Sequence, residues 1–131
     1  MSLTVSVTSN ELNTMVRIVE EFLKEIRSNT EKLDTHQTEK KAKNKQLDEF
    51  IYTAINETIA KNNTYIFKNP NTGLDDLFDM EFSEVSVRMY KDSITAFLDQ
   101  VENIESIGLS KQIEHSKRLL EAFDNSLNDK K

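Results

Sequence analysis

The chain has 131 residues, a formal net charge of −6 and no cysteine. This length is typical of a single domain. The acidic balance argues against nucleic-acid binding, which needs a basic surface, and the absence of cysteine excludes disulfides, thiolate catalysis and cysteine-ligated zinc. Neither a signal-peptide pattern nor an apolar run of the ~20 residues that a membrane span needs is present. We therefore expect a cytoplasmic protein, or one exported without a cleaved signal peptide.

Residues 1–8 contain Leu3, Val5 and Val7 in alternation with Ser and Thr. Because no partner strand is evident nearby, this pattern favours an extended lead-in over a strand. Thr8 and Glu11 have the spacing of a capping box, in which the two residues satisfy each other's backbone N–H groups. A helix is therefore predicted to begin at residue 9.

Residues 9–62 carry an apolar stripe that is strong at both ends and thin between residues 29 and 46. Two interpretations compete: one long helix, or a helix pair that turns somewhere in 35–45. The absence of Gly and Pro favours the long helix, as does a seven-residue spacing across the thin region. That spacing joins Leu12, Val19, Ile26, Leu33, Leu47 and Ala54. Against it, Asp34-Thr35-His36 could form a loop.

Residues 63–82 form an aromatic and acidic loop around the turn signal Asn69-Pro70-Asn71-Thr72-Gly73. Helical patterns follow at 83–107 and 110–128, and Gly108 between them suits a left-handed helix end. The predicted fold is all-α. It is a three- or four-helix bundle, or a helical hairpin with a long N-terminal helix, packed in coiled-coil style.

The sequence offers little for catalysis or metal binding. His36 and His115 lack the spacing of metal ligands and are expected on the surface. Two glycines leave no room for a nucleophile elbow or a phosphate loop. An EF-hand centred on Gly73 fails, because Pro70 falls at a ligand position. We therefore expect no enzyme activity, no cofactor and no metal.

A protein-binding site is predicted in and beside the loop. Its aromatic and apolar members are Tyr65, Phe67, Leu77, Phe78 and Phe82, and its charged members are Asp75, Asp76 and Asp79. The four lysines at 40, 41, 43 and 45 are a candidate electrostatic counterpart, within or between chains. The remaining phenylalanines lie on the helical stripes and are expected in the core: Phe22, Phe50, Phe97 and Phe123.

The opening Val5-Ser6-Val7-Thr8-Ser9-Asn10-Glu11-Leu12, followed by an amphipathic helix, resembles the start of two related groups of small helical proteins. These are the type VII secretion Trp-x-Gly family and its longer relatives that accompany LXG toxins. The resemblance covers the first quarter of the chain, and the Trp-x-Gly turn is absent because the chain has no Trp. It implies a protein that pairs helix against helix with a secreted partner.

Two functional hypotheses follow. The first is a non-enzymatic helical module that binds a protein partner or its own copy, as a heterodimer or homodimer, with a role in secretion as its most specific form. The alternative is an acidic helical inhibitor or immunity protein, of bacterial toxin-antitoxin or phage type, that blocks a basic target.

Overall fold

The computed structural model describes residues 2–101, 104 and 107–129, and within them the chain is mostly helical with one small sheet. In chain order the elements are β1 (Ser2–Val7), α1 (Ser9–Glu31), α2 (Thr38–Lys68), β2 (Phe78–Ser83), α3 (Glu84–Val101), the short 3-10 helix η1 (Ile107–Leu109) and α4 (Ser110–Asp129). The helical prediction is thus confirmed, whereas the prediction that the fold contains only helices is wrong.

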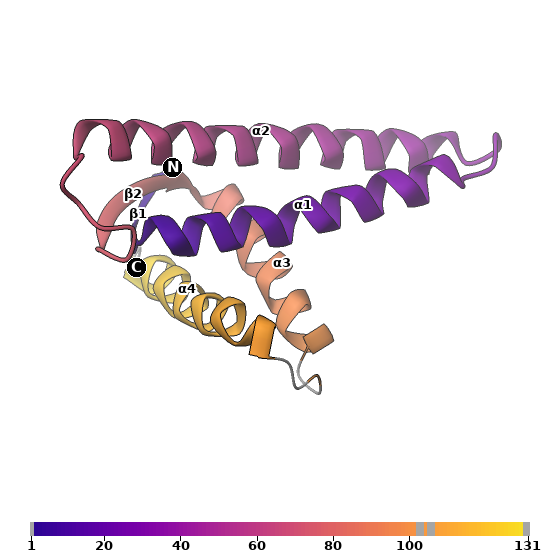
Figure 1. The fold of residues 1–131 in the computed structure, drawn as a ribbon. Coiled ribbons are helices and arrows are strands. Elements are labelled where there is room, and N and C mark those ends of the chain that lie inside the picture. Colours follow the sequence, from indigo (N-terminus) through magenta and orange to yellow (C-terminus); the bar gives the residue numbers. More distant parts are fainter. Residues whose placement is uncertain (1, 102–103, 105–106, 130–131) are drawn as a thin grey trace.

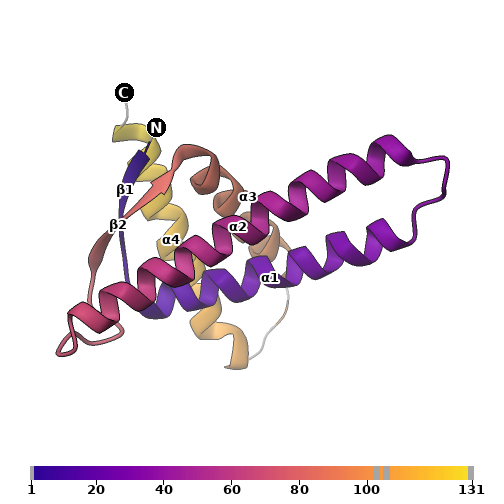
Figure 2. The ribbon, with the colours of Figure 1, turned by 90° about the horizontal axis from the view of Figure 1, so that it is seen from above.

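The two longest helices, α1 and α2, lie antiparallel as a hairpin (Figures 1 and 2). The chain turns between Lys32 and Gln37, so the preference for one continuous helix is wrong. A helix pair forms instead, and its turn includes the predicted loop Asp34-Thr35-His36 but begins before the predicted range 35–45. The physical reason is burial: a lone helix would leave its stripe in water, whereas the hairpin packs the stripe of α1 against that of α2. The buried residues on the two helices include Leu12, Met15, Val19, Leu23, Ile51, Ala54 and Ile55.

The ends of the hairpin helices agree only in part with the sequence. The capping box at the start of α1 is confirmed: the Glu11 N–H donates to Thr8 Oγ1 at 3.1 Å, and the Thr8 N–H donates to Glu11 Oε1 at 2.9 Å. The second helix was expected to end near residue 62, but α2 continues to Lys68. Asn62 is buried and accepts a 2.8 Å hydrogen bond from Ser9 Oγ. Asn62 therefore does not end the helix but joins α2 to the start of α1 through this hydrogen bond.

The predicted lead-in is instead a strand, because β1 pairs antiparallel with β2. Val5 lies opposite Met80 and Leu3 opposite Phe82, with all four side chains buried. The other edge of β1 faces α4. Ser126 Oγ donates to the Thr4 carbonyl at 2.8 Å, and Arg118 donates to the Ser6 carbonyl at 2.7 Å.

The core lies between the sheet, the proximal half of the hairpin, and helices α3 and α4 (Figure 1). Its aromatic centre is Phe82, Tyr90 and Phe123, with ring centroids 5.7 to 6.4 Å apart. Phe123 is buried as predicted, whereas Phe22, Phe50 and Phe97 are only partly buried. The distal half of the hairpin, which carries the turn at residues 32–37, extends past the core (Figures 1 and 2).

The C-terminal helices follow the predicted pattern with shifted ends. Helix α3 begins at Glu84, one residue after the expected start, and is described as far as Val101. Between Val101 and the expected end near residue 107, residues 102–103 and 105–106 lie outside the described part of the chain. Gly108 lies within η1 and has a negative φ, so the predicted left-handed conformation is wrong. Helix α4 begins at Ser110, as expected.

Candidate interaction surfaces

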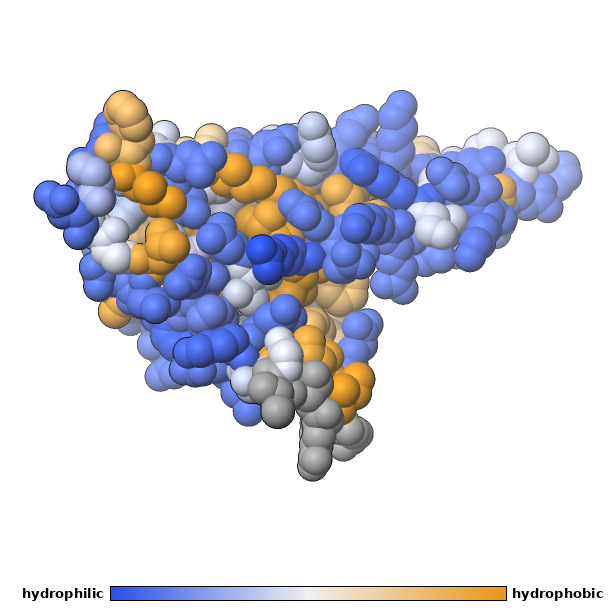
Figure 3. Space-filling view, viewed as in Figure 1, coloured by the Kyte–Doolittle hydropathy of each residue, from blue (hydrophilic) through white to orange (hydrophobic). Residues whose placement is uncertain are grey.

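The hairpin carries an exposed apolar stripe along α2. We define the α2 stripe as Tyr52, Ile59 and Ile66, whose side chains are 54%, 37% and 38% exposed. Residues seven apart in an α-helix project from nearly the same side, so these three form one line parallel to the helix axis. Figure 3 shows hydrophobic residues at the surface between the two hairpin helices. The apolar pattern of residues 9–62 does not show that Tyr52 and Ile59 are exposed, and Ile66 lies beyond that pattern.

The α2 stripe borders a groove between the two helices, which we call the seam groove. It encloses about 260 Å³. Helix α2 contributes Tyr52, Ile55, Asn56 and Ile59, and helix α1 contributes Glu20, Leu23, Lys24 and Arg27. The floor is apolar because Leu23 and Ile55 belong to the core, whereas the rim on α1 is charged. A groove of this composition suits an amphipathic helix.

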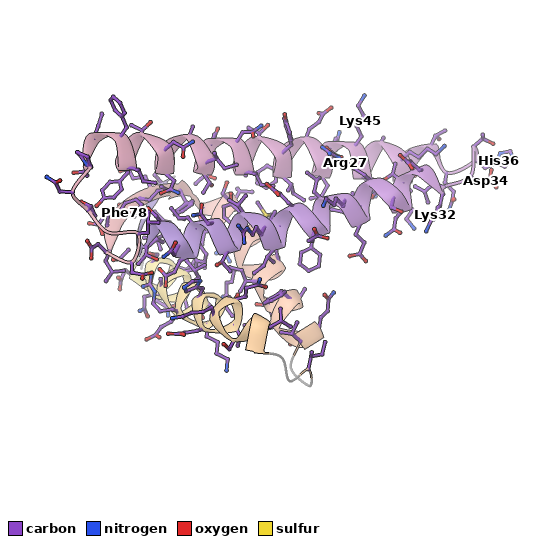
Figure 4. All side chains as sticks on the ribbon, in the orientation of Figure 1. Arg27, Lys32, Asp34, His36, Lys45 and Phe78 are labelled. Atoms are coloured by element: carbon purple, nitrogen blue, oxygen red, sulfur yellow. The ribbon has the colours of Figure 1, made fainter. Side chains whose placement is uncertain are left out.

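An ion pair fixes the distal end of the seam groove. Arg27 Nε donates to Asp48 Oδ2 at 2.6 Å, and its guanidinium carbon lies 5.9 Å from the centre of the Tyr52 ring. Figure 4 places Arg27 between the hairpin helices. The hydrogen bond between Arg27 and Asp48 raises the pKa of Arg27 and lowers the pKa of Asp48. Both groups are therefore ionised at neutral pH, and Arg27 helps to orient Tyr52.

The aromatic and apolar site residues predicted around the loop have three different environments. Phe67 and Leu77 are strongly exposed, at 85% and 60%. Tyr65 and Phe78 are half-buried and stack on each other with ring centroids 3.7 Å apart. Phe82 is only 4% exposed and belongs to the core, so its prediction as a contact residue is wrong. Phe78 and Phe82 point to the same inward face of β2, but Phe78 lies at its first residue and Phe82 lies further along the strand, within the core.

The loop end of the molecule nevertheless presents apolar surface. The exposed residues Phe67 and Leu77 are joined there by Leu74, which is also exposed, and we call these three the loop-end group. Figure 3 shows hydrophobic residues at this end, which lies opposite the hairpin turn. Figure 4 marks the same end by the position of Phe78.

The three predicted aspartates do not act as one charged array. Asp75 accepts a 2.7 Å hydrogen bond from Asn10 Nδ2, and Asp76 accepts one of 2.8 Å from the Gly73 N–H. The Asn10 N–H also donates to the Leu74 carbonyl at 3.1 Å. Asp75 and Asp76 therefore fasten the loop, Asp75 to the first turn of α1 and Asp76 to the loop itself. Asp79 is exposed on the polar face of β2.

The lysine group lies at the other end of the hairpin. Lys40, Lys41, Lys43 and Lys45 occupy the first turns of α2, next to the hairpin turn and far from the acidic loop (Figures 1 and 4). The prediction that these lysines contact the loop aspartates within one chain is therefore wrong. Their role between chains stays a prediction.

The histidines differ from each other. His36 is exposed at the hairpin turn, as predicted (Figure 4). His115 is half-buried, and its Nδ1 lies 2.8 Å from Thr14 Oγ1, so it joins α4 to α1 and is not a free surface residue. Among the described residues there is no group of three or more His, Asp or Glu side chains placed to hold a metal ion. Over the same part of the chain, no helix is long and apolar enough to cross a membrane.

A second hollow, the α1–α3 cleft, opens where α3 and α4 diverge from α1. It encloses about 590 Å³, and its apolar walls include Ile18, Phe22 and Phe97. This cleft explains why Phe22 and Phe97 remain partly exposed. Its rim is strongly charged, with Arg17, Glu20, Glu21, Lys24 and Glu25.

Comparison of the chain with protein-family models, curated proteins and solved structures finds no match.

Proposed function

We propose that the chain is a non-enzymatic helical protein-interaction module, and that its seam groove binds an amphipathic helix of a protein partner. The observation that carries the proposal is the α2 stripe: Tyr52, Ile59 and Ile66 are exposed apolar residues in heptad spacing beside an apolar-floored groove. Single exposed apolar residues are common on protein surfaces and do not indicate a binding site. Apolar residues seven apart on one side of a helix are the pattern through which two helices pack together.

The geometry of the hairpin favours a helix over an extended peptide. The stripe runs parallel to α2, so a helix in the groove would pack along both hairpin helices as a third member of a bundle. Such a partner should carry apolar residues every three or four positions to meet the stripe. An extended peptide would instead need free backbone groups for pairing, and the backbone of both hairpin helices is already hydrogen-bonded internally.

In its more specific form, the proposal is that the partner is a secreted protein of a type VII-like system, and that the chain serves as its partner or targeting factor. The support is the resemblance of Val5–Leu12 to the start of that family, together with the helical hairpin, the form in which those proteins pair with their partners. The partner would then be a different chain, and the functional unit a heterodimer.

Site-specific photo-crosslinking in the source cells tests the proposal. A photoreactive residue at position 59 should crosslink to a helical segment of one protein. Position 57 is the matched control, because Glu57 is also exposed but projects from the opposite side of α2. Crosslinks that are equally frequent from both positions would contradict the seam groove as the binding site.

An acidic inhibitor or immunity protein is the second candidate. The observation that favours it is the pair Asp79 and Glu81, exposed on the polar face of β2 near the loop-end group. Reversing both charges to Lys should weaken one-to-one inhibition of a basic nuclease at least about tenfold. Asp75 and Asp76 are poor choices for this test, because both fasten the loop. Unchanged inhibition would remove the electrostatic version of this function.

A further inference from the structure

We propose that the outer edge of β2 binds an extended, basic segment of a partner protein, which adds to the sheet as a third strand. A two-stranded sheet has two edges, and here they have different neighbours. The edge of β1 is covered by α4, whereas the edge of β2 faces α2 (Figure 1). The proposal does not depend on a partner helix in the seam groove, because that groove contains no residue of the sheet.

The hydrogen bonds around the sheet show which backbone groups point to its outer edges. In an antiparallel pair, two opposite residues either exchange both backbone hydrogen bonds or turn those groups away from each other. Thr4 lies opposite Glu81. The Thr4 carbonyl accepts from Ser126 Oγ of α4 at 2.8 Å, and the Glu81 carbonyl accepts from Lys61 Nζ of α2 at 2.7 Å. These two carbonyls point in opposite directions, so Glu81 turns its backbone groups outward.

The same alternation places four backbone groups of β2 on its outer edge. Asp79 lies opposite Ser6, whose carbonyl accepts from Arg118 on the side of α4. Asp79 therefore also turns its N–H and its carbonyl outward. Of the four groups on Asp79 and Glu81, only the Glu81 carbonyl has a partner among the described residues, the Lys61 ammonium. The other three are free to pair with a new strand.

Helix α2 does not close this edge with its backbone. Two side chains join it to β2: Lys61 reaches the Glu81 carbonyl, and Tyr65 stacks on Phe78 at the first residue of the strand. Seen from above, α2 and β2 are not parallel and separate toward α3 (Figure 2). Lys61 is exposed and has a flexible stem, so a strand about 4.8 Å from β2 displaces only this side chain from the edge. A lysine at a strand edge is a common protection against unselective pairing.

The side chains of β2 specify the chemistry of the added strand. Asp79 and Glu81 are exposed on the polar face and form no ion pair with a described residue. In an antiparallel strand, the residue opposite each of them would lie on the same face, where opposite charges stabilise the pair. The residue between would point to the face on which Met80 is buried. The partner segment therefore has the extended pattern basic–apolar–basic.

A second copy of β2 does not fit this edge. Antiparallel pairing of two copies about Met80 would set Asp79 of each copy opposite Glu81 of the other. Four carboxylates would then share one face, with like charges directly opposite each other, which destabilises a strand pair. The partner is therefore a different chain.

Amide hydrogen exchange on the full chain, with a synthetic peptide as the probe, tests the proposal. The probe is acetyl-Thr-Lys-Val-Lys-Val-Lys-Thr-amide at about 1 mM. Without the probe, the Asp79 and Glu81 amides should exchange at least about tenfold faster than those of Met80 and Phe82, which bond to β1. With the probe, exchange at residues 79 and 81 alone should slow at least about fivefold.

The control peptide has Glu in place of each Lys and should slow neither amide, because its carboxylates would lie opposite Asp79 and Glu81. Equal protection of all four amides without a peptide, equal slowing by both peptides, or slowing by neither would each overturn the proposal.

A proline variant isolates the backbone contribution. Glu81→Pro removes the outward N–H and leaves the bonds of β2 to β1, which lie on the other edge, in place. Glu81→Ala is the matched control, because it also loses the carboxylate but keeps the N–H. The lysine peptide should bind Glu81→Pro at least about tenfold more weakly than Glu81→Ala in an NMR titration. Slow amide exchange at Met80 and Phe82 shows that the sheet is intact.

A variant outside the strand gives a readout that does not depend on how β2 tolerates proline. Lys61→Ala frees the Glu81 carbonyl for the added strand and should strengthen binding of the lysine peptide at least about threefold relative to Lys68→Ala. Lys68 is the control because it carries the same charge at an exposed position of α2. Equal affinities in this pair, or in the pair at residue 81, would contradict strand addition.

Discussion

At the scale of single residues, the buried carboxylate of Glu11 joins three parts of the chain. It accepts hydrogen bonds from the Thr8 N–H at 2.9 Å and from Arg118 Nε at 2.6 Å, and Arg118 also donates to the Ser6 carbonyl. The capping box could be predicted from sequence because its members are three residues apart. The contact of Glu11 with Arg118 of α4 could not be predicted, because Arg118 is far away in the sequence and no local pattern marks it.

Loss of this guanidinium should destabilise the protein. We expect Arg118→Ala to lower the free energy of unfolding by about 2 kcal/mol, because the buried Glu11 carboxylate loses its ion-pair partner. The partial exposure of Arg118 moderates this value. Urea denaturation measures the change. Arg88→Ala is the control, since Arg88 pairs with Glu84 on the surface and should change stability by less than about 0.5 kcal/mol. Similar losses in the two variants would contradict this account of Glu11.

The Tyr90 hydroxyl makes stability sensitive to alkaline pH. Burial raises the pKa of Tyr90 to about 12, and the hydroxyl donates to the Ala54 carbonyl at 3.0 Å. The unfolded chain releases this proton near pH 10, so the contribution to stability is complete below about pH 10 and is lost as the pH rises toward 12.

This loss should disappear with the hydroxyl. Between pH 9 and pH 11, wild type should lose about 1 kcal/mol more unfolding free energy than Tyr90→Phe. Urea denaturation at the two pH values gives the comparison. The variant stays foldable, because the Thr58 hydroxyl keeps its own bond to the Ala54 carbonyl at 2.9 Å. An equal alkaline loss in both proteins would show that Tyr90 does not titrate as a buried group.

At the scale of elements, the sequence predicts what is local and misses what is distant. The helical stripes are periodic, so the pattern predicts helix over the residues of α1, α2, α3 and α4, although it favours joining α1 and α2 into one helix. Strand β1 was missed because the partner of Val5 is Met80, far along the chain. The seven-residue spacing across Leu33 suggested one helix, yet a hairpin also satisfies it, since both helices face the same core.

Phe67 at the end of α2 and Phe82 in β2 look equivalent in sequence but have different environments. Phe82→Ala should cost about 3–5 kcal/mol of unfolding free energy, because it leaves a cavity among Tyr90 and Phe123. Phe67→Ala should change stability by no more than about 0.5 kcal/mol, because its ring is in water. Thermal or urea denaturation of the two variants checks the difference, and equal costs would place Phe82 outside the core. Phe67→Ala is therefore the suitable variant for binding studies at the loop end.

At the scale of the whole molecule, the fold divides into a packed body and a protruding arm. The body joins the sheet, α3, α4 and the proximal hairpin around one core, and the distal hairpin extends from it (Figure 1). Composition and periodicity were enough to predict a helix-rich protein. They did not locate the seam groove, because whether Ile59 lies inside or outside depends on where α1 packs against α2, and pattern alone does not determine that.

The most direct test of the seam groove is an NMR titration of the isotope-labelled chain with the partner helix identified by crosslinking. Binding in the groove predicts backbone amide shifts along both of its walls, residues 20–27 of α1 and 52–66 of α2, and Ile59→Asp should abolish them without unfolding the protein. Shifts confined to Phe67, Leu74 and Leu77, or to the α1–α3 cleft, would contradict the account and move the binding site to that surface.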